Sequence, residues 1–169
     1  MNARDPIFSI QALPDIQARV DERKLAIQRV GVKGITHPIT LLGRGGAQAT
    51  IAQLGMYVAL PEDQKGTHMS RFLEVLHEQR EPLSASALAQ LLDRMLERLS
   101  AQAGAIELSC PYFVMKTAPV SGVESLMNYE VRLIAERTSA AGLRVTQEVG
   151  VPVTSLCPCS KEISDYGAH

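Results

Sequence analysis

The sequence predicts an α+β fold in which an antiparallel β-sheet carries two helices on one face. The expected order is β-β-α-α-β-β, followed by one more strand. In the segments before and after the centre of the chain, apolar residues alternate with polar ones, as in strands that bury one face. In the centre, apolar residues recur every three or four positions, as in amphipathic helices. Strand pairs on either side of two helices favour one sheet with one helical layer.

The first strand pair surrounds a glycine-rich turn. A β-rich segment at residues 35–42 leads into the sequence GRGG at residues 43–46, which is a turn signal. Apolar residues then take every second position: Ala52, Leu54, Met56, Val58 and Leu60. This pattern predicts a hairpin whose second strand buries one face.

Two helices should follow. Thr67 or Ser70 could cap the first, and Ser84 lies near the start of the second, which we expect to end by Gly104. The side chains expected to face inward from the first helix are Phe72, Leu73 and Leu76. Those of the second helix are Leu88, Leu91, Leu92, Met95 and Leu99. Both stripes predict helices that pack on a sheet or on a partner helix.

Strand alternation returns after the helices. A strand around residues 106–110 leads to the loop KTAPVSG at residues 116–122, and a second strand covers about residues 129–135. After the turn at residues 139–142, a further strand is expected over about residues 143–153. We therefore divide the chain into a flexible N-terminal segment (1–24, with a short helix around 16–23), a first module (25–140) and the start of a second module (141–169).

Composition excludes several classes of function. The net charge of −1 provides no general attraction for nucleic acid or anionic membranes, and 4% aromatic residues argue against a base-stacking surface. We find no apolar run of membrane-spanning length and no secretory signal. Three cysteines suggest no disulfide framework, so we expect a cytoplasmic protein. From the charge, the aromatic content and the apolar runs, we expect no nucleic-acid or membrane partner.

The segment PVTSLCPCSKEISDYGAH, residues 152–169, concentrates possible metal ligands. Cys157, Cys159 and His169 are donor types that zinc, iron and manganese sites use. The Cys-x-Cys spacing is not that of a structural zinc knuckle, so one cysteine, one histidine and a ligand from elsewhere make a simpler site with an open position. From spacing alone, a small buried thiol and a solvated histidine remain the more ordinary interpretations.

Three phrases, taken together, resemble one family. They are EDQKGTHMSRF (62–72), KTAPVSG (116–122) and PVTSLCPCSKEISDYGAH (152–169). In this order they resemble the type IB GTP cyclohydrolases, from about Val30 to the last residue. The resemblance implies a tunnelling fold with two modules in each subunit, assembled as a homotetramer with active sites at interfaces.

The resemblance also implies an activity. The family converts GTP and water to 7,8-dihydroneopterin triphosphate and formate, the first step toward tetrahydrofolate and, in many bacteria, queuosine. Metal-activated water attacks guanine C8, with one divalent ion (Zn, Fe(II) or Mn) in each site and no organic cofactor. By motif position, Cys157 is a catalytic residue and a metal ligand, and His169 is a second ligand. Cys159 either supports the site without binding the metal or forms a disulfide with Cys157.

Two polar groups are candidates for the triphosphate of GTP. Lys65, His68 and Arg71 lie where a loop enters the first helix, and a helix start offers free N–H groups to an anion. The resemblance favours this role over ordinary surface charge. Lys116 and Ser121 flank the KTAPVSG loop, which either contacts phosphate or a subunit interface or only connects two strands.

Most of the family's second module has no counterpart in these 169 residues. We therefore expect an incomplete portion of a longer enzyme that exposes a sheet edge and an apolar face and is prone to aggregate. The main alternative is a catalytically inactive assembly module of the same fold. Two others are a tunnelling-fold nitrile reductase with a cysteine nucleophile and a small structural metal site.

Overall fold

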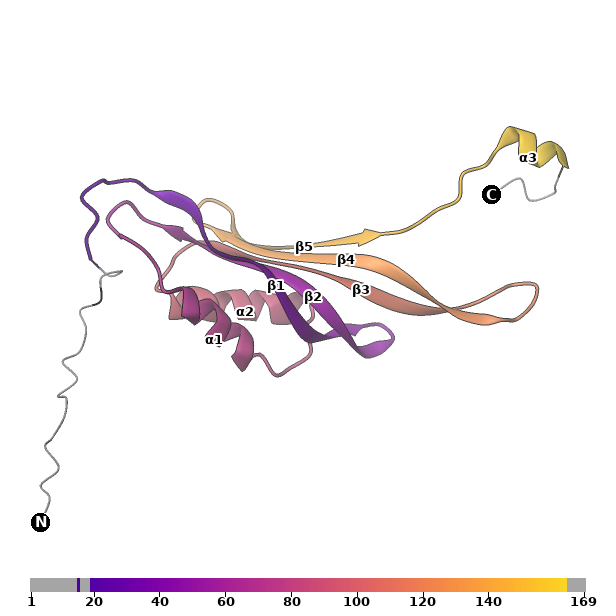
Figure 1. Cartoon of the computed structure of the whole chain (residues 1–169), viewed down its shortest axis with the longest axis horizontal. Coiled ribbons are helices and arrows are strands. Elements are labelled where there is room, and N and C mark those ends of the chain that lie inside the picture. Colours follow the sequence, from indigo (N-terminus) through magenta and orange to yellow (C-terminus); the bar gives the residue numbers. More distant parts are fainter. Residues whose placement is uncertain (1–14, 16–18, 164–169) are drawn as a thin grey trace, which may run out of the picture.

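In the computed structural model, which describes residue 15 and residues 19–163, one five-stranded antiparallel sheet has the order β1-β2-β3-β4-β5. The helices α1 and α2 lie against one face of this sheet (Figure 1). The elements are β1 (Ile27–Gly43), β2 (Gly46–Leu60), α1 (Met69–Glu78), α2 (Ala85–Arg98), β3 (Gly104–Thr117), β4 (Glu124–Thr138), β5 (Gly142–Gly150) and α3 (Pro158–Ile163). The predicted α+β class and the order of the first seven elements are confirmed.

The core forms between the sheet and the two helices. Its sheet side contains the alternating residues predicted for β2 and β3, including Met56 and Ile106, which are fully buried. Its helix side contains the predicted stripe of α2, with Leu88, Leu91 and Leu92 also at 0% exposure. Each such side chain contributes about 1.5–3 kcal/mol through removal from water, so this layer holds the helices in place.

Some helix details differ from the prediction. Leu73 is 49% exposed and Val75 takes its place in the core, because the inward face of α1 is rotated from the predicted stripe. The N-cap of α1 is His68, so Thr67 and Ser70 do not occupy that position. The predicted start of α2 near Ser84 is confirmed. Ser84 is the N-cap of this helix, and its hydroxyl accepts a hydrogen bond from the Ala87 N–H at 3.2 Å.

The bounds of several elements also differ from the predicted ones. Among the described residues of the predicted 16–23 helix, the backbone is not helical: Val20 forms a β-bridge with Gln64, and the Asp21 N–H donates to the Asp63 carbonyl. β1 begins at Ile27 instead of residue 35, because a register shift next to Gly34, at φ 73°, interrupts the alternation. α2 ends at Arg98, and Gly104 instead begins β3.

β5 ends at Gly150, three residues before the predicted end. Pro152 follows closely, and proline has no backbone N–H to donate to β4. The chain then leaves the sheet and leads to α3, which lies apart from the helical layer (Figure 1).

The sheet divides into two hairpins at one end. Pairing of β2 with β3 stops at Gln53↔Ser109, and pairing of β4 with β5 stops at Glu130↔Gly150. Pairing of β1 with β2 and of β3 with β4 continues to the turns. The β3–β4 hairpin therefore extends beyond both of its neighbours.

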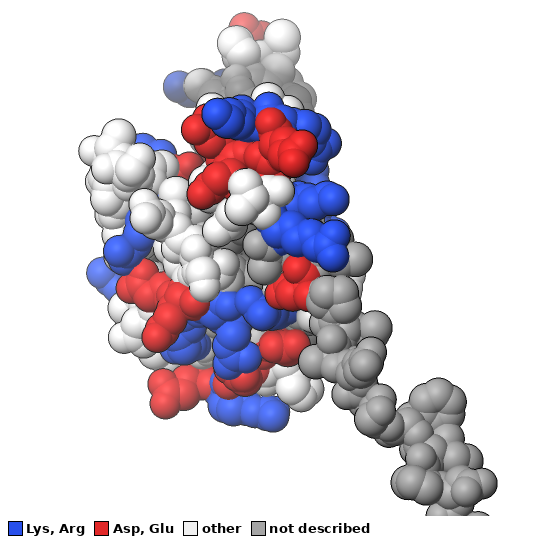
Figure 2. Space-filling model, turned by 90° about the vertical axis from the view of Figure 1, so that its left-hand side faces the viewer, with Lys and Arg blue, Asp and Glu red and all other residues white. Residues whose placement is uncertain are grey.

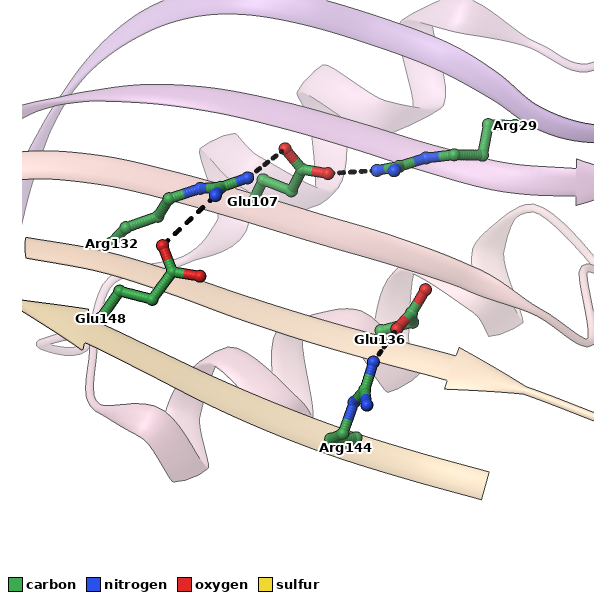
Figure 3. A network of polar contacts seen from close by, with 6 residues as sticks. All are labelled: Arg29, Glu107, Arg132, Glu136, Arg144 and Glu148. Carbon is green, nitrogen blue, oxygen red and sulfur yellow. Dashed lines mark hydrogen bonds and ion pairs between the residues drawn. The ribbon is translucent and has the colours of Figure 1, made fainter. Parts of the chain in front are cut away.

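The face of the sheet opposite the helices carries an ion-pair network (Figure 3). Glu107 accepts from Arg29 and from Arg132, and Arg132 also contacts Glu148 at 3.3 Å. Arg144 pairs with Glu136 at 3.0 Å. Where the helices lie, the sheet is thus apolar and covered on one face, while its other face carries paired charges. No helix in the described part of the chain is long and apolar enough to cross a membrane.

Candidate functional site

Cys157 lies directly before α3, where the first N–H groups of the helix are available. Hydrogen bonds from the Ser160 backbone N–H, the Ser160 hydroxyl and then Cys159 hold the pKa of the Cys157 thiol below its ordinary value. The Cys157 carbonyl accepts from the Lys161 N–H at 3.1 Å. Since the thiolate is the form that binds metals and attacks electrophiles, α3 prepares Cys157 for either role.

The remaining metal donors are only partly visible in the structure. Cys157 is half-buried and Cys159 exposed, and both are free thiols in this structure. His169, the second predicted ligand, lies outside the described residues. Across residue 15 and residues 19–163, no group of three or more His, Cys, Asp or Glu side chains is arranged to hold a metal ion. Of the two predicted ligands, the described residues include Cys157. The lowered pKa of its thiol favours the thiolate, which suits a divalent transition metal.

The predicted basic cluster lies where the chain enters α1, at the end of the sheet away from α3 (Figure 1). His68 Nε2 is 3.0 Å from a carboxylate oxygen of Asp15, and an Arg71 guanidinium N–H donates to the Arg98 carbonyl at 3.4 Å. Lys65 is in the preceding loop, where its backbone N–H donates to the Arg19 carbonyl. Basic and acidic side chains are interleaved over this end of the molecule (Figure 2). Two of the three predicted phosphate ligands are thus engaged by the chain itself.

Lys116 and Ser121 lie at the far turn of the β3–β4 hairpin. The Ser121 hydroxyl accepts from the Val123 N–H at 3.4 Å, and Gly122 has φ 70°, so the turn is locally ordered. At about 3.3 Å per residue, β3 separates this turn from the start of the strand by about 40 Å. The cluster of Lys65, His68 and Arg71 lies near that start, because Arg71 contacts the end of α2. One chain therefore does not bring the two groups into one site.

The sequence reasoning missed a groove of about 840 Å³ between the two hairpins. The start of α2 and part of β5 also line it, and Lys116 is among its lining residues. Its other lining residues include Leu41, Gln48, Tyr112, Tyr129, Val149 and Val151. The only sequence signal was Pro111, which cannot donate a ladder hydrogen bond and marks where β3 leaves β2.

A family model described as "Type I GTP cyclohydrolase folE2" matches residues 13–169. The chain is 55% identical over 169 residues to GTP cyclohydrolase FolE2 2 of Cupriavidus metallidurans. It is 54% identical over 160 residues to GTP cyclohydrolase FolE2 of Herminiimonas arsenicoxydans and 54% identical over 170 residues to that of Ralstonia nicotianae.

These alignments cover 95–100% of this chain but 61–62% of each relative. The chain thus spans less than two thirds of the length of the curated relatives that it matches. Nevertheless, the family match includes all three phrases that carried the resemblance, together with the helical layer and all five strands. The chain belongs to the type I GTP cyclohydrolase FolE2 family.

Proposed function

We propose that this chain forms part of a type IB GTP cyclohydrolase, which converts GTP and water to 7,8-dihydroneopterin triphosphate and formate. The observation that carries the proposal is the 53–55% identity to relatives named GTP cyclohydrolase over nearly the whole chain. The reaction is the first step toward tetrahydrofolate and queuosine. The proposed enzyme acts in the cytoplasm.

The site would form around the segment before α3. Cys157 and His169 would hold one divalent ion, Zn, Fe(II) or Mn, and no organic cofactor is proposed. The ion supplies Lewis-acid activation of water near neutral pH. The contribution of Cys157 is a thiol whose pKa is lowered by hydrogen bonds from Ser160 and Cys159. This contact supports a role for Cys159 as a neighbour of the ligand, without bonding to the metal.

The triphosphate would use residues from two ends of the sheet. Lys65, His68 and Arg71 form one group, and Lys116 and Ser121 form the other. Since about 40 Å of strand separates them within one chain, they can serve one substrate only across a subunit interface. This separation supports the proposal of a tunnelling fold assembled as a homotetramer, with sites between subunits.

The test is a fluorescence assay for oxidised neopterin after incubation with GTP and Mn(II). We would compare the 169-residue chain with a form extended to the full length of its relatives. The extended form should be active, and Cys157→Ser should abolish its activity and its bound metal while it remains folded. Inactivity of the extended form with each of the three metals would overturn the proposal.

A second candidate is a catalytically inactive assembly module. The observation that favours it is that the described residues contain no cluster of three metal-ligating side chains. Activity restricted to the extended form would assign this role to the 169-residue portion, which would then contribute subunit contacts and a partial metal site.

A further inference from the structure

The outer part of the β3–β4 hairpin has no backbone pairing with its neighbouring strands. We call residues 111–129 the arm. On one side β2 stops pairing with β3 at Ser109, and on the other side β5 stops pairing with β4 at Glu130. Within the arm, β3 and β4 remain paired as far as Thr117↔Glu124. Since a two-stranded hairpin is marginally stable alone, its side contacts decide its position.

Pro111 explains why the arm separates from β2. Continued in the same register, Pro111 would face Ile51 and Phe113 would face Ala49. The N–H and C=O groups of Phe113 both point toward β2, and alternate residues share that direction in an antiparallel ladder. Pro111 lies two residues before Phe113, so its backbone also faces β2. The N–H that proline lacks is therefore one that the ladder would use.

The side chain of Gln48 replaces the missing ladder. Its carboxamide oxygen accepts from the Phe113 N–H at 2.8 Å, and its amide nitrogen donates to the Phe113 carbonyl at 3.1 Å. The Thr50 hydroxyl donates to the Pro111 carbonyl at 2.9 Å. The arm is thus tied to the β1–β2 hairpin by side chains where the rest of the sheet uses backbone pairs.

One further contact lies at the tip of the β1–β2 hairpin. The Tyr112 hydroxyl sits so close to Gly43 that any Cβ at this position would overlap it. Tyr112 and Gln48 both line the 840 Å³ groove between the two hairpins. The width of this groove therefore depends on how the arm is held.

We propose that the arm is a hinged element, with its pivot at Pro111 and the Gln48 carboxamide as its clamp. Release of the two Gln48 hydrogen bonds lets the paired β3–β4 ladder of the arm swing as a unit and widen the groove. Lys116 and Ser121 move with it, so on the proposed function the clamp sets the position of the outer phosphate ligands. The hinge itself does not depend on that function.

Amide hydrogen exchange followed residue by residue by NMR tests the hinge. Exchange at Phe113 should accelerate about tenfold or more in Gln48→Ala, because its N–H loses its partner. Val114 pairs with Met127 on the other side of β3 and should keep its wild-type rate. Gln53→Ala is the matched control, because Gln53 bonds Thr36 within the β1–β2 hairpin and should leave Phe113 unchanged.

Three results would overturn the proposal. An unchanged rate at Phe113 in Gln48→Ala would show that the clamp does not hold the arm. Equal acceleration at Phe113 and Val114 would show that the arm unfolds and does not swing. Acceleration across residues 104–109 as well would show that the arm unfolds with the core. None of these readouts uses enzymatic activity, so failure of the cyclohydrolase proposal would leave the result interpretable.

Discussion

Arg132 on β4 donates to Glu107 on β3 at 3.3 Å, on the face of the sheet opposite the helices (Figure 3). Glu107 also accepts from Arg29, whose guanidinium lies 4.2 Å from the centre of the Tyr57 ring. Hydrogen bonding to Arg29 is the largest cause that lowers the pKa of Glu107 from 4.5, and Arg132 adds to it against the opposing effect of burial. One carboxylate thus links β1, β3 and β4.

This pairing predicts a specific acid sensitivity. Because the folded pKa of Glu107 is below its unfolded value, its stabilising contribution is present above pH 4.5 and is lost as the pH falls through the lowered pKa. Glu107→Gln should cost about 1 kcal/mol at pH 7 and much less at pH 3, as measured by urea unfolding. Glu148→Gln, in a more exposed part of the network, should cost less than Glu107→Gln at pH 7. An equal cost of Glu107→Gln at both pH values would contradict the assignment.

The orientation of α1 and α2 predicts a contrast between two leucines. Leu92 is fully buried beneath the sheet, whereas Leu73 is 49% exposed. Leu92→Ala should lower the free energy of unfolding by about 2–5 kcal/mol, because it removes apolar contacts and leaves a cavity. Leu73→Ala should cost less than about 1 kcal/mol. Denaturant melts of both variants decide the matter, and comparable losses would mean that α1 is rotated from the observed position.

The capping difference between the two helices makes a second paired prediction. Ser84→Ala removes the hydroxyl that accepts from the Ala87 N–H, so it should cost about 1 kcal/mol of stability. Ser70→Ala, in the first turn of α1 and outside the cap position, should change stability by less than about 0.5 kcal/mol. Thermal melts would compare them; a larger loss for Ser70→Ala would restore the sequence-based assignment of that cap.

The periodic patterns of apolar residues correctly predicted the strands and helices that bury one face. The alternation of β2 and the leucine stripe of α2 were predicted correctly because each strand or helix buries one continuous face. Residues 27–34 of β1 were missed because the register shift at Gly34 reverses the alternation. The divided sheet and its groove were missed for a different reason. They depend on the register between β2 and β3, which are separated in the sequence by both helices.

The candidate site was predictable only in its donor types. Cys157 was selected from its sequence context, but its acidity comes from N–H groups of α3, a helix that the sequence reasoning did not anticipate. Lys65 and Lys116 were both candidates for one ligand, yet strand length places them at opposite ends of the sheet. In the proposed enzyme their relation would depend on subunit assembly, which the sequence of one chain does not encode in a local pattern.

The last prediction rests on the contrasting environments of the Cys110 and Cys157 thiols. Burial raises the pKa of the Cys110 thiol to about 11, while hydrogen bonds lower that of Cys157. In a Cys159→Ser variant at pH 7.5, iodoacetamide should therefore modify Cys157 and leave Cys110 intact until the protein unfolds, as read by mass spectrometry of peptides. If Cys157 is a metal ligand, Zn(II) or Mn(II) should slow its modification about tenfold or more in the form extended to the length of its relatives. His169→Ala should weaken that protection, whereas His77→Ala, a change on the exposed side of α1, should not. Unprotected modification of Cys157 at saturating metal would remove it from the proposed ligand set.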